Sequence, residues 1–470
     1  MECAVNVRTL AWIETALSTS EGLLARARLA GRAEGAWRGA AIDSRGDCAG
    51  RLFFALSGGR TDGHRFVRDA YAAGAAAAVI DQAPLSEALA REGVAHFVVS
   101  DARAALTALA SAWREHLDVR VVAITGSGGK TTTKELIRAA MRTRYRVHTS
   151  AGNYNSTIGV PLTLLDAEED SEYLVCELGA NQTGEIAQLS ALVKPDTGVI
   201  TNIGDAHVGC FGSRDAIAAA KGELLDALPA EASAVLPRDD TYFPALHARA
   251  RARVTSFGLA AESDVRLSDV RVLEHGTEFR VAGVAFTLRS FGVYNALNAC
   301  AAAAAADACG VPIEATRDAL AELSPMAGRG RVHEAGGVLV VDESYNASPA
   351  STRLSLSMLA GLKAERRYAV LGDMRELGDY TRAGHEEVGR HVASLRIDKV
   401  FWKGEEAGAV AAGLAAAGGG AALERFEDAA ALLSAVLSII RPGDAVLVKG
   451  SRAIELDRLV EGIVAARASD

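Results

Sequence analysis

The chain has 470 residues, of which 49% are hydrophobic and 23% charged, a composition typical of a globular protein. The net charge of −9 argues against non-specific binding to nucleic acid, so we expect no nucleic-acid partner. No hydrophobic run approaches the ~18 residues of a membrane-spanning helix, and the start lacks the pattern of a signal peptide. We therefore expect no membrane insertion.

The cysteines indicate where in the cell the protein is located, and the chain length indicates how many domains it has. The six cysteines form no C-x-x-C pair, which favours reduced thiols and a cytoplasmic location. At roughly 100–200 residues per domain, the length suggests about three domains. The pattern of strands and helices places them at residues 1–102, 103–327 and 328–470.

Residues 1–102 are predicted to form a small α/β unit. Ser44 and Arg45 precede the strand Arg51–Leu56. A hydroxyl and a guanidinium at this place suit the diphosphate of a sugar nucleotide, but a capped turn with a surface arginine explains them equally well. The other elements are the polar loop Ser57–Phe66, a helix at Val67–Ala73, and strands at Ala77–Ile80 and His96–Val99.

The segment Val121–Glu135, VVAITGSGGKTTTKE, carries the clearest chemistry in the chain. A hydrophobic strand leads into a glycine turn, and a helix follows. Glycines let backbone N–H groups approach phosphate oxygens, and the helix N-terminus adds the positive end of its dipole. We therefore predict a nucleotide phosphate loop, with its lysine on the phosphates and a threonine on Mg²⁺. Its residues are Gly126, Ser127, Gly128, Gly129, Lys130, Thr131 and Thr132.

One position departs from the full pattern G-x-x-x-x-G-K-[ST]. Ile124 stands where that pattern has its outer glycine, so the chain carries only G-x-x-G-K-T. A plain glycine turn with an exposed lysine is the alternative. The strand before the turn and the helix after it favour nucleotide binding.

Polar residues also follow two further predicted strands. The strand Tyr173–Leu178 contains Glu177 near its end, and Gly198–Ile203 runs into Asp205 and His207. Ligands bind at the carboxyl ends of strands in parallel sheets. Glu177 and His207 are therefore candidate Mg²⁺ ligands, although a lone histidine is more often structural.

Other polar groups of the central region are more ambiguous. The polar loop Ala151–Thr163 contains Asn153 and Asn155, which are candidates for substrate binding. Lys221 follows three alanines, and its simplest interpretation is an exposed lysine. Four segments are expected to form an antiparallel extension of the sheet. They are Val235–Leu236, Val254–Gly258, Val265–Leu273 and Glu278–Leu288.

Two asparagines begin a helix that is predicted over Tyr294–Ala306. Asn295 and Asn298 are three residues apart, so they are neighbours on the helix surface. Both can meet the edge of a base. Capping of the helix by Asn295 is the alternative.

Residues 328–470 are predicted to form a third α/β unit, with an open, Rossmann-like parallel sheet. Arg329 lies at the junction with the central region, and the strand Val338–Val341 ends on Asp342. Further strands are expected at Tyr368–Leu371, Val400–Trp402 and Ala445–Val448. Polar residues follow these strands, which indicates one working edge of the sheet.

Together these segments resemble the Mur ligase family, the ATP-dependent amide-bond ligases of peptidoglycan synthesis. TGSGGKTTTKE is similar to the family's phosphate loop, which also lacks the outer glycine. AGNYNSTIGVPLT, ELGANQTGEI, TNIGDAHVGCFGS, DESYNASP, LGDMRELG and VKGSR follow in the family's order over nearly the whole chain. The resemblance implies an ATP-binding central P-loop domain between a small α/β N-terminal domain and a Rossmann-like C-terminal domain.

The resemblance further implies an activity and its partners. It implies that the protein joins D-alanyl-D-alanine to UDP-N-acetylmuramoyl-tripeptide through an acyl phosphate. It also implies that the protein is a cytoplasmic monomer. A sister ligase that adds the third amino acid would carry an Asn-Pro-Arg triplet and a GKGHE-like segment. The chain has neither and reads KGSR at Lys449–Arg452.

The resemblance also implies roles for single residues. Two Mg²⁺ sites would involve Thr131, Glu177, His207 and Lys221, the last as a carbamate. Catalytic roles fall to Lys130, Lys221, His207 and Arg329. Nucleotide contacts beyond the phosphate loop fall to Asn295, Asn298, Arg329, Asp342 and Tyr345. Substrate contacts fall to Ser44, Arg45, Asn153, Asn155, Asn346 and Ser348.

Other functions share part of this pattern. The nearest are related ligases, such as a folyl-polyglutamate synthetase or the sister peptide ligase. An ATPase or kinase that transfers phosphate to water or an alcohol is a second class, and a non-catalytic nucleotide-binding regulator is a third. The sequence leaves open the third residue of the peptide and the residues that bind the dipeptide.

Overall fold

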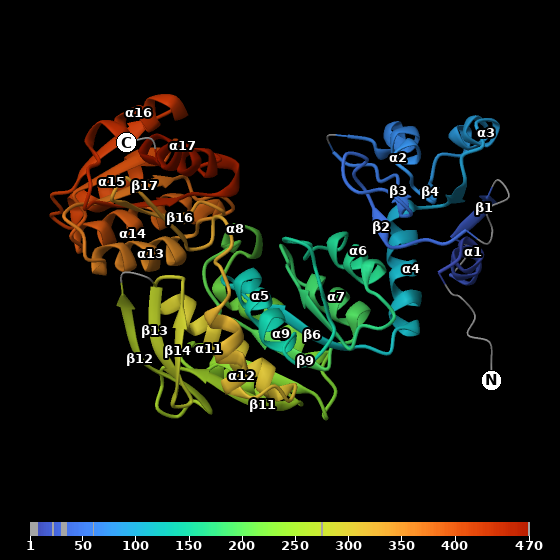
Figure 1. Cartoon of the computed structure of the whole chain (residues 1–470), viewed down its shortest axis with the longest axis horizontal. Helices are drawn as coiled ribbons and strands as arrows, with labels where there is room; N and C mark the ends of the chain where they lie inside the picture. The colour runs from blue at the N-terminus through green and yellow to red at the C-terminus, as the bar shows by residue number, and fades with distance from the viewer. Residues whose placement is uncertain (1–7, 21–22, 30–34, 60, 274–275, 469–470) are drawn as a thin grey trace. The chain divides into compact units, whose positions relative to one another are not determined.

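The protein is an α/β protein, as predicted, with three β-sheets flanked by helices (Figure 1). The computed structural model describes residues 8–20, 23–29, 35–59, 61–273 and 276–468. Its chain divides into two compact units. The first comprises Met1–Ala123, Tyr145–Gly179 and Gln188–Pro195, and the second comprises Ile124–Arg144, Ala180–Ala187 and Asp196–Asp470.

The first sheet has the strand order β1-β5-β4-β3-β2 and is parallel except for β1. Its strands are β1 (Leu24–Arg28), β2 (Ala40–Ala41), β3 (Leu52–Phe54), β4 (Ala77–Ile80) and β5 (His96–Val99). Its neighbouring helices are α1 (Leu10–Thr19), α2 (Val67–Ala72), α3 (Ala83–Arg91) and α4 (Ala102–His116). The predicted strands β4 and β5 are confirmed residue for residue, because each is a short, fully buried and mostly apolar run.

The second sheet has the order β14-β13-β12-β11-β10-β9-β6-β8-β7. The strands are β6 (Arg120–Thr125), β7 (Val147–Thr149), β8 (Tyr173–Glu177), β9 (Thr197–Ile200), β10 (Ser233–Pro237), β11 (Arg253–Gly258), β12 (Val265–Leu273), β13 (Gly276–Val281) and β14 (Val284–Leu288). The helices are α5 (Lys130–Met141), α6 (Gly159–Asp166), α7 (Glu185–Val193), α8 (Val208–Phe211), α9 (Arg214–Asp226), α10 (Phe243–Arg249), α11 (Val293–Ala308) and α12 (Ile313–Ala321).

Three predictions for this region were wrong in detail. β10, β11 and β12 pair in parallel, and only the pairs β12–β13 and β13–β14 are antiparallel. The predicted strand Glu278–Leu288 is interrupted by a tight turn at Ala282 and Gly283, which both have positive φ. The polar loop Ala151–Thr163 ends in a helix, because α6 begins at Gly159.

The third sheet has the order β15-β16-β20-β17-β18-β19, with only β15 antiparallel. Its strands are β15 (Arg331–Ala335), β16 (Val338–Glu343), β17 (Arg367–Gly372), β18 (Lys399–Lys403), β19 (Ala422–Phe426) and β20 (Ala445–Lys449). Helices α13 (Pro349–Gly361), α14 (Thr381–Ala393) and α15 (Ala407–Ala416) pack on one face, and α16 (Ala429–Ile439) and α17 (Asp457–Ala468) pack on the other (Figure 1). This doubly wound arrangement leaves the carboxyl ends of β16–β20 at one edge.

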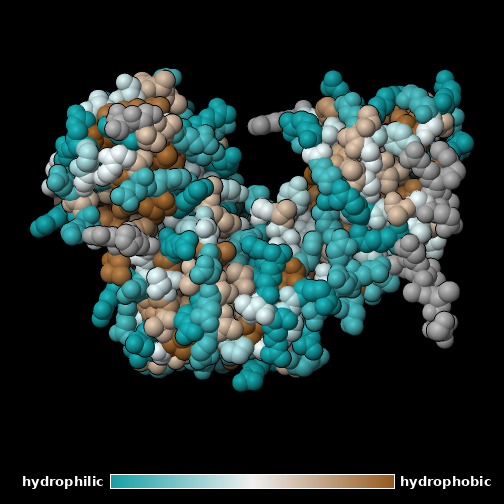
Figure 2. Space-filling view, viewed as in Figure 1, coloured by the Kyte–Doolittle hydropathy of each residue, from teal (hydrophilic) through white to brown (hydrophobic). Residues whose placement is uncertain are grey.

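None of the helices in the described residues is both long enough and apolar enough to cross a bilayer. On the face in Figure 2, hydrophobic residues form separate spots among hydrophilic ones.

Two glycines allow α14 and α15 to pack closely. A Cβ on Gly389 would lie 2.1 Å from the carbonyl oxygen of Val410, and a Cβ on Gly413 would lie 2.0 Å from that of Glu386. Contacts this short require backbone displacement, since real Cβ atoms essentially never approach within 3.0 Å. Gly408, also on α15, has no atom within 4 Å of the same position.

We predict that Gly389→Ala destabilises the protein by about 1–3 kcal/mol, because the methyl group forces the two helices apart. Gly408→Ala is the matched control and should stabilise by ~0.5–1 kcal/mol, because alanine favours the helix. Denaturant midpoints measure both effects. Equal midpoints for the two variants would contradict this account of the helix contact.

Candidate active site

The predicted phosphate loop joins β6 to α5, and two of its glycines are required by geometry. Gly126 has φ +144° and Gly129 has φ +77°, values that side chains rarely adopt. A Cβ on Gly126 would lie 1.9 Å from Oγ1 of Thr201, and one on Gly129 would lie 2.3 Å from Oδ1 of Asn298. The loop therefore packs against two other segments in a way that only glycine permits.

The segment after β9 holds this loop in place. The backbone N–H of Gly128 donates to Oδ1 of Asn202 at 3.0 Å, and Oγ1 of Thr201 donates to the Gly128 carbonyl at 2.6 Å. The N–H of Gly204 donates to Oγ of Ser127 at 2.9 Å. Sequence reasoning gave Thr201 and Asn202 no role. Both residues fall within the predicted strand Gly198–Ile203, but β9 ends at Ile200, so they belong to the loop that follows it.

Lys130 is the first residue of α5, and its Nζ donates to the Gly126 carbonyl at 2.8 Å. Thr131 is buried, and Thr132 is half-buried. The N-terminus of this twelve-residue helix directs N–H groups and a positive dipole toward the loop. Strand, turn, lysine and helix are thus arranged as anion binding requires.

The predicted asparagine pair lies on α11 beside this loop. Asn298 is buried and its Oδ1 accepts from Oγ1 of Thr133 at 3.4 Å, while Nδ2 of Asn295 donates to the Phe291 carbonyl at 2.8 Å. The residue that caps α11 is Gly292, so the capping alternative for Asn295 was wrong. Contact of the pair with adenine stays a prediction.

At the end of β16, Asp342 organises the junction that carries Arg329. Its carboxylate accepts from the N–H of Gly328 at 2.7 Å and from Oγ of Ser344 at 2.6 Å. The guanidinium carbon of Arg329 lies 3.8 Å from the centre of the Tyr345 ring, a cation–π contact. The structure therefore brings Arg329, Asp342 and Tyr345 together.

A buried charge pair lies beneath the same loop. Nζ of Lys449 donates to Oε2 of Glu343 at 2.9 Å and to the carbonyl of Asn346 at 3.1 Å. Glu343 also accepts from Tyr294 of α11 and from Oγ of Ser355. Burial alone would raise the pKa of Glu343, but the Lys449 ammonium and these hydrogen bonds outweigh it and lower the pKa. Glu343 and Lys449 were quoted in sequence motifs without a role.

Asn346 and Ser348 follow this charge pair. The Asn346 side chain is exposed, and its Oδ1 accepts from the N–H of Ala347 at 2.9 Å. Ser348 caps α13 in a reciprocal arrangement with Ser351. Their predicted contacts with substrate stay predictions.

His207 precedes α8 and has φ +65°. Its Nδ1 lies 2.7 Å from Oε2 of Glu376, which follows β17. This contact holds the pKa of Glu376 below its ordinary value, and the charge of Lys130 adds to the effect. Within the second unit, the loop after β17 therefore contacts His207 and lies close enough to Lys130 to feel its charge.

The other predicted metal residues are buried. Glu177 is 2% exposed, and its Oε1 accepts from Nδ2 of Asn155 at 2.7 Å. Lys221 is 1% exposed, so the simple interpretation as an exposed lysine was wrong; its Nζ lies 5.7 Å from the Phe211 ring centre. Two residues on, Glu223 accepts from the N–H groups of residues 184 and 187 and fixes the start of α7.

No set of three His, Cys, Asp or Glu side chains in the described part of the chain is grouped to hold a metal ion. Mg²⁺ bound with nucleotide takes few protein ligands, because phosphates and water complete its shell. A hydroxyl such as that of Thr131, a carboxylate such as that of Glu177 and an imidazole such as that of His207 are chemically suited to such an ion. Binding of Mg²⁺ by these residues stays a prediction.

In the first unit, the substrate candidates lie on loops. Arg45 is 88% exposed and pairs with Asp43 at 2.7 Å, while Ser44 is half-buried. Asn153 is exposed. Sequence reasoning missed His64, which is buried with Nδ1 2.7 Å from Asp62 and Nε2 3.0 Å from Asp81. It ties the predicted polar loop Ser57–Phe66 to the residue that follows β4.

Fold and site together define an α/β nucleotide-binding protein. Three family models match it: "Mur ligase family, catalytic domain" at residues 38–114, "Mur ligase middle domain" at 124–306, and "Mur ligase, glutamate ligase domain" at 328–452. The chain belongs to the Mur ligase family.

Relatives and solved structures agree with this family. Proteins named UDP-N-acetylmuramoyl-tripeptide–D-alanyl-D-alanine ligase are similar: that of Synechocystis sp. is 38% identical, over 90% of this chain and 91% of its own, and that of Bacillus subtilis is 36% identical, over 91% and 93%. MurF from Acinetobacter baumannii superposes with a TM-score of 0.81 at 32% identity, over 91% of this chain and 93% of its own. MurF ligase from Thermotoga maritima in complex with ADP gives 0.78 at 29%, over 92% and 98%.

We predict that Lys130→Ala lowers ATP turnover by ~10²–10³, because a preorganised charge is removed from the phosphoryl group. Lys194→Ala removes a surface charge and is the control. The measurement is steady-state phosphate release at saturating ATP, with unfolding midpoints to verify folding. Near-normal turnover of Lys130→Ala would rule out the phosphate-loop assignment.

Proposed function

We propose that the chain is an ATP-dependent ligase that joins D-alanyl-D-alanine to UDP-N-acetylmuramoyl-tripeptide. The supporting observation is similarity over about nine-tenths of the chain to proteins of that name, at 38% and 36% identity. The assembled phosphate loop supplies the part that handles ATP. The solved structure of UDP-N-acetylmuramoyl-L-alanyl-D-glutamate–2,6-diaminopimelate ligase is only 18% identical in sequence to this chain, so it supports the fold alone.

The reaction needs ATP because a carboxylate oxygen is a poor leaving group. The terminal carboxylate of the tripeptide attacks the γ-phosphorus, ADP leaves, and an acyl phosphate forms. The dipeptide amine then attacks the acyl carbon, and the tetrahedral intermediate collapses to an amide with release of phosphate and a proton. Each step brings anions together, so fixed positive groups lower the barrier.

The residues described above fit these steps. Lys130 and the N-terminus of α5 would hold the β- and γ-phosphates. Arg329, placed by Asp342 and stacked on Tyr345, would add a second cation at the γ-phosphate. Asn295 and Asn298 would contact adenine, and Asp342 the ribose. Ser44, Arg45, Asn153 and Asn155 would contact the UDP-sugar peptide, and Asn346 and Ser348 the substrate loop.

We also propose that two Mg²⁺ ions take part. When bound, they would neutralise charge on the phosphates and the attacking carboxylate. Thr131 would contribute a hydroxyl, Glu177 a carboxylate and His207 an imidazole. Hard oxygen donors suit Mg²⁺, and the family resemblance adds His207 to this set.

Lys221 would enter this site as a carbamate. A bare ammonium beside two cations is repelled, whereas carbamylation by CO₂ reverses the charge and supplies oxygen donors. Burial of Lys221 supports the proposal, since water competes less for a buried carbamate. The amine must be neutral to react with CO₂, and bound Mg²⁺ ions would favour the neutral form over the ammonium.

We place the enzyme in the cytoplasm and expect a monomer. In the described part of the chain, Cys48, Cys176, Cys210, Cys300 and Cys309 are not paired in disulfides, which supports a reducing compartment. The domain division at residues 102/103 and 327/328 also stays a prediction.

The proposed function is tested by omitting one substrate at a time. With ATP, UDP-muramoyl-tripeptide and D-Ala-D-Ala present, we expect stoichiometric phosphate and a product of the mass of the pentapeptide. Phosphate release that needs only water indicates an ATPase, and ligation of single amino acids indicates a sister ligase. A screen of UDP-muramoyl di- and tripeptides identifies the accepted third residue.

For Lys221 we predict that Lys221→Ala nearly abolishes ligation and that small carboxylic acids restore it in part. Acetate is the probe, and sodium chloride at the same ionic strength is the control. The measurement is amide formation in both salts. A Lys221→Ala enzyme with parental activity would end the carbamate proposal.

A further inference from the structure

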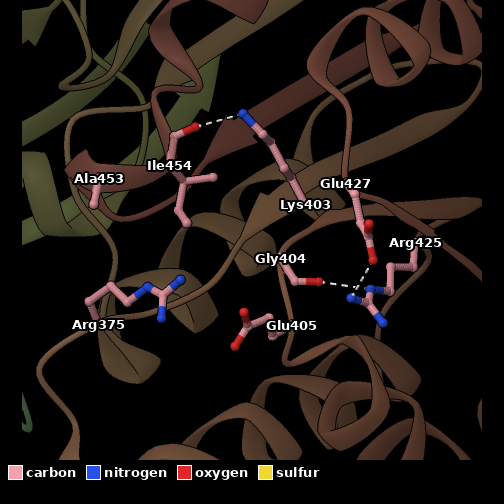
Figure 3. A pocket seen from close by; sticks show the side chains of 8 residues that line it. All are labelled: Arg375, Lys403, Gly404, Glu405, Arg425, Glu427, Ala453 and Ile454. Atoms are coloured by element: carbon pink, nitrogen blue, oxygen red, sulfur yellow. Dashed lines mark hydrogen bonds and ion pairs between the residues drawn. The ribbon is translucent and has the colours of Figure 1, made fainter.

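A pocket opens at the carboxyl ends of the third sheet, and its lining residues have no role assigned so far. Its volume is about 350 Å³ (Figure 3). It is lined by three cations, Arg375, Lys403 and Arg425, and by two carboxylates, Glu405 and Glu427. These residues follow or end β17, β18 and β19, where open parallel sheets bind their ligands.

The cations present donors to this pocket. Lys403 ends β18, and its Nζ donates to the Ile454 carbonyl at 2.9 Å. An ammonium has three donors, so this bond leaves capacity for a ligand. Nε of Arg425 donates to the Gly404 carbonyl at 3.0 Å, and its Nη2 donates to Glu427 at 2.9 Å. These bonds hold both head groups at the pocket wall, as Figure 3 shows.

A buried carboxylate fixes the wall before any ligand arrives. Asp373 is 1% exposed and accepts from the N–H groups of Glu405 at 2.9 Å and Glu406 at 3.1 Å, and from Nε1 of Trp402 at 3.0 Å. Gly404 has φ +135°, and a Cβ there would lie 2.2 Å from the Asp373 carboxylate. A rigid wall reduces the ordering cost of binding.

The size and charge of the pocket limit what it can bind. Its volume is near the lower end of the ~300–1,000 Å³ of small-molecule sites, too small for a nucleotide-sugar peptide. The two carboxylates offset part of the cationic charge, so a singly charged carboxylate fits better than a polyphosphate. Ala453 and Ile454 add a small apolar wall that suits methyl groups.

The pocket also has a defined relation to the phosphate loop within the second unit. Arg375 precedes Glu376, whose Oε2 lies 2.7 Å from Nδ1 of His207. The loop after β17 thus carries both a residue of the pocket lining, Arg375, and the residue that contacts His207.

We propose that this pocket binds the free carboxylate of the incoming D-Ala-D-Ala through Lys403 and Arg425. The inference rests on the proposed function and assigns residues to the dipeptide. Arg375, held by Asp373 at 3.4 Å, completes the positive lining.

The test compares D-Ala-D-Ala with its C-terminal carboxamide, which lacks the charge. We expect the wild type to prefer the acid by roughly tenfold to a hundredfold in kcat/KM, the range for a charge-assisted hydrogen bond. Lys403→Met and Arg425→Met should each reduce this preference to a few-fold, with KM for ATP and the tripeptide unchanged. The control is Arg458→Met, at an arginine whose side chain is 77% exposed on α17, and it should keep the wild-type ratio.

Each other outcome has one meaning. Normal ligation with an unchanged acid-to-amide ratio in both pocket variants overturns the pocket assignment alone, and so does a wild type that uses acid and amide equally. No ligation of D-Ala-D-Ala by the wild type overturns the proposed function and this inference with it. If Lys403→Met fails to fold because the bond to Ile454 is lost, Arg425→Met decides the question.

Discussion

The structure of the site depends on the hydrogen bonds between the phosphate loop and the segment after β9. Thr201 and Asn202 bind the backbone of Gly128 from both its N–H and its carbonyl side. The close approach of Thr201 to Gly126 makes glycine obligatory there. Because neighbouring strands hold both segments, the loop is shaped before nucleotide binds. Anion binding then requires little reorganisation, which is how fixed dipoles stabilise charge most effectively.

The third sheet uses buried carboxylates in the same way. Asp342 fixes the junction that carries Arg329, Glu343 with Lys449 fixes the loop after β16, and Asp373 fixes the pocket wall. Each is costly to bury and is compensated by several hydrogen bonds or a cation. The strands end on these carboxylates, so they convert a rigid sheet edge into positioned loops. We interpret this edge as the place where nucleotide and acceptor meet.

Short sequence patterns predicted many of the strands and the phosphate loop. The glycine turn before Lys130 and the apolar runs of β4 and β5 are local patterns that need no knowledge of partners. The role of Asn202 depends on contact with Gly128, far away in sequence, and strand direction at β10 is likewise a tertiary property. β1, β15 and β19 were not predicted, because these edge strands are largely polar or exposed. Arg425 lies on β19, so the pocket could not be foreseen either.

The central claim is that the tripeptide carboxylate, not water, accepts the γ-phosphoryl group of ATP. The most direct test labels both oxygens of that carboxylate with ¹⁸O and follows a complete reaction with D-Ala-D-Ala in unlabelled water. Mass spectrometry of the released phosphate then reports the acceptor. An acyl phosphate predicts one ¹⁸O atom in each phosphate and one in each new amide. Phosphate without ¹⁸O, formed together with the amide product, would contradict the account.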